Sequence, residues 1–281
     1  MVKPGRPLET WTSTETDWPR APVRVAEETQ ASMPRNGRPL GARYPDVSGT
    51  AFYIGGMSPA DELFATYRTT RARMTRLAAD LSPLDLRRIV PACPQWTVFD
   101  LIAHVVSMPA AIALGASPRG SITAWLQDLV EDRRDQSVGE LTEEWLSLDD
   151  DIAVIVKGPG GLLFDDLAVH EHDLRGTVGA PDHGALEVEV LLPRTLAGFA
   201  ESLRHAGLRS IVVRHGDRMW RSHDSEPGWT LEVAPWEAVR ALYSRRTADE
   251  LRGLPHDGNV EPYLAILDAH LPLPTTSLNE P

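Results

Sequence analysis

From Ser58 onward the sequence alternates helical stretches with short segments that no helix can cross. The first stretch opens with Ser58 and Pro59, which suit the N-cap and the first helical position. Its apolar residues recur at helical spacing to about Leu81. The segment 90–96 then holds two prolines, and a second break at 158–161 combines a proline with three glycines. This alternation predicts a mainly α fold in which several helices pack together.

Two of the predicted helices carry histidines together with acidic residues. One begins at Thr97, with Asp100 three residues later as a capping pair, and His104 lies among its apolar residues. The other spans about 162–178 and ends at Gly179, a residue suited to the left-handed position after a helix. Its acidic residues and histidines include Asp166, His170, Glu171, His172 and Asp173.

The remaining segments predict further helices and a small sheet. Residues 121–157 indicate one short and one longer helix. From about residue 185 the pattern changes to short strands joined by turn residues, followed by short helices. The expected strands are 210–214, 218–221 and 229–233, and the expected helices are 235–243, 247–252 and 260–270. We therefore expect a small α+β domain over 185–281, with a linker near 181–184.

Residues 1–56 differ from the rest of the chain. They hold seven of the 23 prolines and six of the 21 glycines, with no sustained helical period. We interpret this segment as a disordered or loosely attached extension. An alternative is that the protein starts at Met57, directly before the first predicted helix. The expected organisation is this extension, a helical domain over 57–184, and the C-terminal domain.

The composition argues against several classes of partner. The net charge of −12 works against binding to nucleic acid or to anionic membranes, since both are polyanions. No apolar run is long enough to span a bilayer. Lys3 and Arg6 are followed by polar residues rather than by the apolar core of a signal peptide. We expect a cytoplasmic protein that binds a small molecule or another protein, with its oligomeric state left open.

Asp166 and His170 lie four residues apart, which puts both side chains on one face of a helix, one turn apart. A carboxylate and an imidazole at that spacing can bind one ion, and His104 can add a third ligand from a facing helix. Such a set suits zinc, and equally iron, nickel or cobalt, and leaves coordination positions open. The alternative is a chance pair on one helix and a satisfied core histidine on the other. Cys93 is the only cysteine, so a thiolate-rich zinc site is excluded.

Three segments share their pattern with a known family. The first is Arg71 with Leu77. The second is Val90-Pro91-Ala92-Cys93-Pro94-x-Trp96-Thr97-Val98-x-Asp100-Leu101-x-x-His104, and the third is Asp166-x-x-x-His170-x-x-Asp173-Leu174-Arg175-x-x-x-Gly179-x-Pro181. Together they resemble the mycothiol-dependent maleylpyruvate isomerase family. The resemblance covers about 57–185 and continues through 229–231 and 242–246 to 271–273.

This resemblance implies a DinB-like four-helix bundle followed by a small α+β domain. It also implies that His104, Asp166 and His170 bind a divalent metal, usually zinc. Family members use mycothiol, a small thiol, whose sulfur ionises more readily beside the metal. The expected protein is a mycothiol-dependent enzyme that acts on a small electrophile, as an isomerase or a thiol S-transferase. The alternatives are a non-enzymatic metal- and thiol-binding module for sensing or regulation, and a bundle without metal.

The chain departs from the family pattern at two positions. The isomerase has a glutamate where this chain has Asp166, so the helix must approach the metal more closely or Asp166 must use a different rotamer. The family often has Gly-Arg where this chain has Ser244-Arg245, and that arginine can bind a carboxylate substrate. We carry the role over to Arg245. Arg246 can take the same role instead, or both arginines are surface charges.

Two acidic residues lie close to the candidate ligands in the helices. Asp100 can orient His104 by a hydrogen bond from behind the metal, or it can cap its helix, which the spacing favours. Asp173 can support His170 in the same way, or it can pair with Arg175.

Three further residues receive a structural interpretation. Glu171 and His172 are rotated away from the Asp166 face by about 100° per residue, so we expect them to face solvent. Cys93 lies near a helix start, where a thiol can become reactive. A structural role for it is favoured, because sequence places no base beside it.

Overall fold

The structure is a computed structural model that describes residues 58–118, 120–158, 161–182 and 187–280. The extension over 1–56 and the alternative start at Met57 lie outside the described residues. Parts of the break at 158–161 and of the linker at 181–184 also lie outside them.

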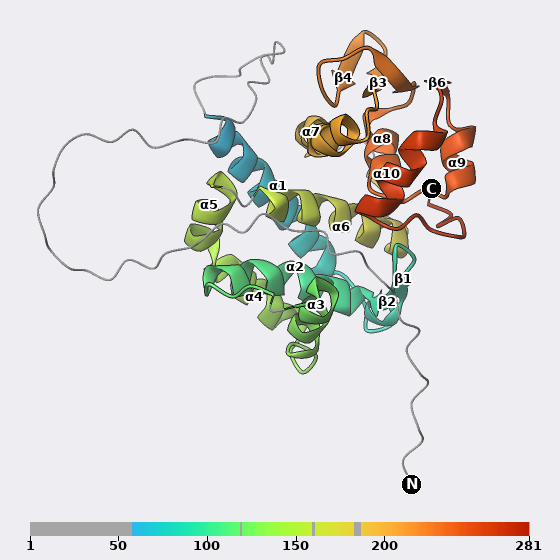
Figure 1. The fold of residues 1–281 in the computed structure, drawn as a ribbon. Helices are drawn as coiled ribbons and strands as arrows, with labels where there is room; N and C mark the ends of the chain where they lie inside the picture. The colour runs from blue at the N-terminus through green and yellow to red at the C-terminus, as the bar shows by residue number, and fades with distance from the viewer. Residues whose placement is uncertain (1–57, 119, 159–160, 183–186, 281) are drawn as a thin grey trace, which may run out of the picture. The chain divides into compact units, whose positions relative to one another are not determined.

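Six α-helices form the N-terminal part of the described chain (Figure 1). Their bounds are α1 Pro59–Ala79, α2 Val98–Ala113, α3 Ile122–Glu131, α4 Val138–Ser147, α5 Asp149–Lys157 and α6 Leu162–Val178. Helix α2 packs against α3, α4 and α6, while α1 packs against α5 and α6. The expectation of two helices over 121–157 is wrong, because Leu148 separates α4 from α5. Acidic residues at Asp149–Asp151 favour a new helix start there.

The core of this part is formed by the apolar faces that the periodicity predicts. Tyr67 and Met74 of α1 are buried, as are Val98, Leu101 and Ile102 of α2. The indole nitrogen of Trp145 donates a hydrogen bond to the Tyr67 hydroxyl at 2.9 Å. The polar ends of two large buried side chains therefore satisfy each other within the core.

The proline-containing segment before α2 forms a small hairpin rather than a loop. A 3₁₀ turn at Asp85–Arg87 precedes β1 (Ile89–Val90), which pairs antiparallel with β2 (Cys93–Thr97). Prolines exclude a helix here, as predicted, but they are compatible with an edge strand. Both strands of a two-stranded sheet are edges, so the missing N–H groups are tolerated.

The C-terminal part begins with a long helix that the sequence pattern did not predict, α7 (Glu187–His205). It is followed by a four-stranded sheet of order β4-β3-β5-β6, in which β3 and β5 are parallel and the other pairs antiparallel. The strands are β3 Ser210–His215, β4 Arg218–Arg221, β5 Pro227–Leu231 and β6 His256–Gly258, and the helices are α8 Pro235–Leu242, α9 Ala248–Gly253 and α10 Glu261–His270. The mainly α fold class with a smaller α+β part is confirmed.

Helix α7 contacts α1 and α6 of the N-terminal part as well as α8, β3 and β4. The division into domains at residue 185 stays a prediction. Among the described residues, none of the helices combines the length and the hydrophobicity that a membrane span requires.

Candidate metal centre

Local signals fix the two helices that carry the candidate ligands. The Thr97 hydroxyl accepts the backbone N–H of Asp100 at 3.2 Å, and the Asp100 carboxylate accepts the backbone N–H of Thr97 at 3.0 Å. This capping box starts α2 and sets the direction of His104 two turns later. Helix α6 ends at Gly179, whose φ of 74° is left-handed. Both helix ends agree with the sequence prediction.

The structure brings His104, Asp166 and His170 together. The Oδ1 atom of Asp166 lies 3.3 Å from Nε2 of His104 and 3.5 Å from Nε2 of His170. The two imidazole rings are edge-on, with centroids 5.0 Å apart. One donor atom from each residue falls within a group no wider than 4.8 Å. Two imidazole nitrogens and a carboxylate oxygen at this spacing fit a divalent metal such as zinc.

The three side chains also interact strongly through their charges. Burial raises the pKa of Asp166, but His104 and His170 more than offset it, so this pKa lies below its ordinary value. Burial lowers the pKa of His170, but the carboxylates of Asp166 and Asp173 hold it well above its ordinary value. A positive charge is therefore favoured between these groups, supplied by a proton or by a cation.

The surroundings leave one side of the site accessible. The His104 side chain is 2% exposed, whereas a quarter of the Asp166 side chain meets solvent. The ring of Trp96 lies 4.6 Å from the His104 ring and 6.3 Å from the His170 ring, and its indole nitrogen donates to Gln127. Trp96 thus lies close to both histidines, and Asp166 is the most exposed of the three candidate ligands.

Asp173 interacts with Nδ1 of His170, the ring nitrogen that does not face Asp166. Nδ1 of His170 lies 3.0 Å from the Oδ2 atom of Asp173, whose side chain is fully buried. The Asp173 carboxylate also accepts hydrogen bonds from Arg240 at 2.7 Å and from Arg245 at 2.6 Å. Burial raises the pKa of Asp173, but the two arginines bring it well below its ordinary value. The ionised Asp173 therefore sets the orientation of the His170 ring.

The structure decides between the alternatives considered for Asp100 and Arg245. Asp100 caps α2 and lies 3.5 Å from Arg134. Nδ1 of His104 has no hydrogen-bond partner among the described residues, so Asp100 does not orient it. Arg245 is buried and donates to Asp173 and to the Tyr243 carbonyl. The alternative that Arg245 is a surface charge is therefore wrong.

Cys93 lies closer to chemically active groups than the sequence indicated. Its sulfur belongs to a group of donor atoms within 4.8 Å that also includes His170 and Asp173. The side chain is half-buried at the start of β2. Sequence spacing could not reveal this contact, because β2 and α6 are distant in the chain and meet only through packing.

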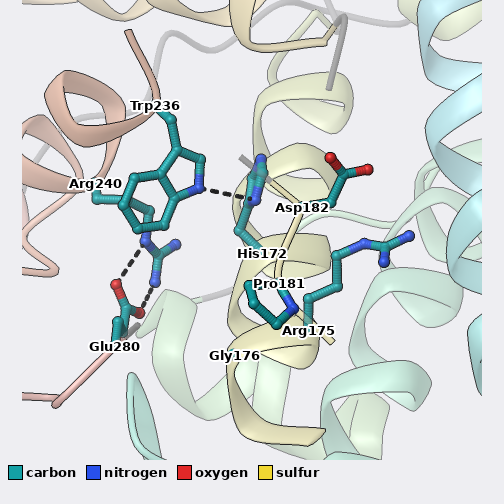
Figure 2. Close-up of a pocket in the computed structure, with 8 residues that line it drawn as sticks. All are labelled: His172, Arg175, Gly176, Pro181, Asp182, Trp236, Arg240 and Glu280. Carbon is teal, nitrogen blue, oxygen red and sulfur yellow. Dashed lines mark hydrogen bonds and ion pairs between the residues drawn. The ribbon is translucent and has the colours of Figure 1, made fainter. Parts of the chain in front are cut away.

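The opposite face of α6 is buried, so the prediction that Glu171 and His172 face solvent is wrong. Glu171 is fully buried and accepts hydrogen bonds from Arg73 of α1 and from Arg175. Nδ1 of His172 accepts the indole N–H of Trp236 at 3.3 Å (Figure 2). The reason is that α1, α7 and α8 cover this face, which a helical wheel cannot foresee.

Comparisons with known proteins give one family match and two similar solved structures. The model of the family described as "Mycothiol maleylpyruvate isomerase N-terminal domain" matches residues 67–217, more than half of the chain. No curated protein sequence matches the chain. The crystal structure of the mycothiol-dependent maleylpyruvate isomerase is 14% identical, with a TM-score of 0.44, over 67% of this chain and 90% of that chain. A histidine-to-alanine mutant of that enzyme is 13% identical, with a TM-score of 0.44, over 66% and 90%.

Proposed function

Because the chain belongs to the mycothiol maleylpyruvate isomerase N-terminal domain family, we propose that it is a metal-dependent enzyme that uses mycothiol to attack a small electrophile. The membership confirms the resemblance noted in the sequence. The observation that carries the proposal is the convergence of His104, Asp166 and His170, with their donor atoms within 4.8 Å of one another.

In this proposal His104, Asp166 and His170 hold one divalent ion, for which zinc is the best candidate. The donor set suits zinc, and three protein ligands leave positions free for a substrate. The bound ion lowers the pKa of a thiol, so that the thiolate nucleophile is present at neutral pH. The buried Asp173 supports this role, since its bond to Nδ1 leaves Nε2 of His170 facing Asp166.

The chain's own residues supply access and orientation. Trp96 shields the histidines, and the exposed quarter of the Asp166 side chain marks the entry side. The proposed substrate is an electrophile with a conjugated double bond or another centre that a thiolate attacks. Addition forms a carbon–sulfur bond, and the electron pair moves into the conjugated carbonyl. Rotation about the former double bond, followed by return of the electron pair and expulsion of the thiolate, restores the double bond and completes an isomerisation. Protonation of the enolate carbon, with the sulfur retained, gives a thiol conjugate instead.

The test begins with metal analysis of protein purified without chelator, followed by assays with mycothiol and a panel of electrophiles that includes maleylpyruvate. We expect about one metal ion per chain, and a thiol-dependent product. The variant His104→Ala should lose metal and activity together. Full metal content in His104→Ala overturns the ligand assignment, and metal-loaded protein that neither binds nor uses mycothiol overturns the enzymatic proposal.

A second candidate is a metal- and thiol-binding module that performs no reaction. The observation that favours it is that Arg245, which we expected to bind a substrate carboxylate, donates its hydrogen bonds to Asp173 instead. Tight thiol binding without turnover, measured by calorimetry, supports this candidate over the enzyme. For either candidate we propose a cytoplasmic location, because a reducing compartment keeps a small thiol reduced.

A further inference from the structure

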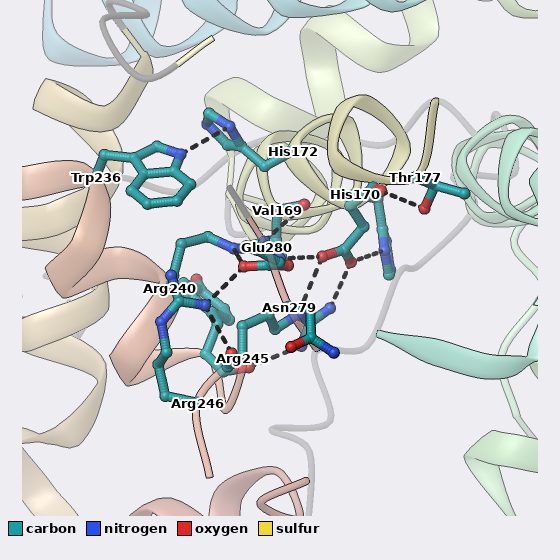
Figure 3. A network of polar contacts seen from close by, with 12 residues as sticks. Val169, His170, His172, Thr177, Trp236, Arg240, Arg245, Arg246, Asn279 and Glu280 are labelled. Atoms are coloured by element: carbon teal, nitrogen blue, oxygen red, sulfur yellow. Dashed lines mark hydrogen bonds and ion pairs between the residues drawn. The ribbon is translucent and has the colours of Figure 1, made fainter. Parts of the chain in front are cut away.

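Two arginines beside the candidate metal centre bind a carboxylate that comes from the chain's own C-terminal segment. Glu280 accepts hydrogen bonds from Nε of Arg240 at 2.9 Å and from Nη1 of Arg246 at 2.7 Å, and Nη2 of Arg240 also contacts it. The Arg240 side chain is 1% exposed and that of Glu280 is 9% exposed. The guanidinium groups of Arg240 and Arg246 converge on the Glu280 carboxylate (Figure 3). This arrangement suits a planar anion.

The charges at this site balance only while an anion occupies it. Three arginines face three carboxylates here: Arg240, Arg245 and Arg246 face Asp173, Glu237 and Glu280. Asp173 satisfies Arg245, and Glu237 satisfies Arg246. Without Glu280 the cluster carries one excess positive charge in a buried position, which is costly unless another anion replaces it.

Glu280 belongs to an irregular C-terminal segment, whereas the arginines that bind it lie in or next to helices. Residues 272–280 form neither helix nor strand, and Ser277 and Asn279 are exposed. Ser277 bonds to Glu250 at 2.6 Å, and its hydroxyl accepts the Asn279 backbone N–H. In contrast, Arg240 belongs to α8, and Arg246 lies in the short turn between α8 and α9. The carboxylate can therefore leave without unfolding a helix.

Two small cavities meet at Glu280. One is lined by residues that include His172, Arg175, Trp236 and Arg240 (Figure 2), and the other by residues of the β1–β2 turn, α6 and the C-terminal segment. Their volumes of about 10 Å³ and about 30 Å³ hold one or two water molecules. Glu280 lines both cavities, so the space that its side chain occupies borders both of them.

We propose that Arg240 and Arg246 form a binding site for a small carboxylate ligand, and that Glu280 occupies this site until the ligand displaces it. The inference goes beyond the proposed reaction and does not depend on a bound metal. Its position has a consequence, because Arg240 also bonds to Asp173, the residue that orients His170. An anion that replaces Glu280 therefore binds next to Asp173, which orients the candidate metal ligand His170.

The test compares the full chain with Glu280→Ala, using sodium acetate and sodium succinate as probes and sodium chloride at equal ionic strength as reference. Removing the internal competitor should tighten succinate binding by about tenfold or more. Acetate should raise the melting temperature of Glu280→Ala more than chloride does. Glu261→Ala, which removes a carboxylate from the exposed Arg252 pair, is the matched control and should respond equally to both salts.

Two further measurements complete the test. Adding Arg246→Gln to Glu280→Ala should abolish the acetate effect. In the wild-type chain, saturating succinate should increase hydrogen–deuterium exchange over 272–280. Equal responses of Glu280→Ala to acetate and chloride overturn the site, and unchanged exchange at succinate saturation overturns the displacement. If Glu280→Ala does not fold, Glu280→Gln serves for the same comparison.

Discussion

Nδ1 of His170 lies 3.0 Å from the Oδ2 atom of Asp173, while Nε2 of the same ring lies 3.5 Å from Asp166. One histidine thus connects the candidate metal site to a buried carboxylate that two arginines hold in place. The arginines fix the charge and position of Asp173, and Asp173 fixes which nitrogen of His170 faces the site. Metal affinity and folding stability should therefore both depend on Asp173.

Asp173→Asn should weaken metal binding by about 10- to 100-fold, because the ring of His170 loses its anionic partner. It should also lower the free energy of unfolding by about 3–5 kcal/mol, because Arg240 and Arg245 lose a buried counter-charge. Competition with a chromophoric chelator measures the affinity, and urea denaturation measures the stability. Asp249→Asn, an exposed carboxylate, is the control. Unchanged metal affinity in folded Asp173→Asn contradicts the proposed link.

Asp166→Asn should abolish stoichiometric metal binding, since the substitution removes the carboxylate between His104 and His170. Asp165→Asn makes the same change one residue away, where the side chain pairs with Arg194 instead. It should keep its metal even though it loses some stability. Metal content after purification without chelator compares the two variants. Equal metal content in both excludes Asp166 as a ligand.

The helix positions of the candidate ligands could be predicted because they depend on local signals. Asp166 and His170 share a helix face through their spacing, and the Thr97 cap sets the register that points His104 inward. The family resemblance then indicated that His104 meets Asp166 and His170 at one site, which spacing along the sequence cannot show. The fold class followed from the same helical periodicities and from the strand patterns after residue 210.

What could not be predicted depends on contacts between distant segments. Helix α7 contains Pro193 and carried no clear periodic signal, so nothing in the pattern indicated that it covers one face of α6. The burial of Glu171 and His172 follows from that cover. The partners of Asp173 and the position of Glu280 depend on the packing of α8 and the C-terminal segment against α6, which no local pattern encodes.

Glu171→Gln should destabilise the protein without affecting metal affinity. The carboxylate of Glu171 is fully buried between Arg73 and Arg175, so its neutralisation leaves buried charges uncompensated and should cost about 3–5 kcal/mol. It lies on the face of α6 away from Asp166. Urea denaturation and chelator competition on the same sample separate the two effects. A large fall in metal affinity contradicts the separation of the two faces.

Metal binding at neutral pH should release about one proton per ion. Burial lowers the pKa of His170, but Asp166 and Asp173 hold it well above its ordinary value of 6.5, so the metal-free site carries a proton there. Because this folded-state pKa is raised, the stability it contributes is fully present below about pH 6.5 and is lost as the pH rises through the folded value. A metal ion takes the place of that proton, so apparent affinity should increase with pH over the same range.

Calorimetric titration in two buffers of different ionisation enthalpy measures the released proton as a difference in apparent binding enthalpy. The difference should vanish once the pH exceeds the raised pKa of His170, because no proton remains to be displaced. His270→Gln is the control, since burial lowers the pKa of His270 and its ring packs against Phe199 of α7. This variant should release the same proton as the wild-type chain. A binding enthalpy that is independent of the buffer at pH 7 shows that His170 is already neutral. That result contradicts the inference that the metal-free site carries a proton which the metal displaces.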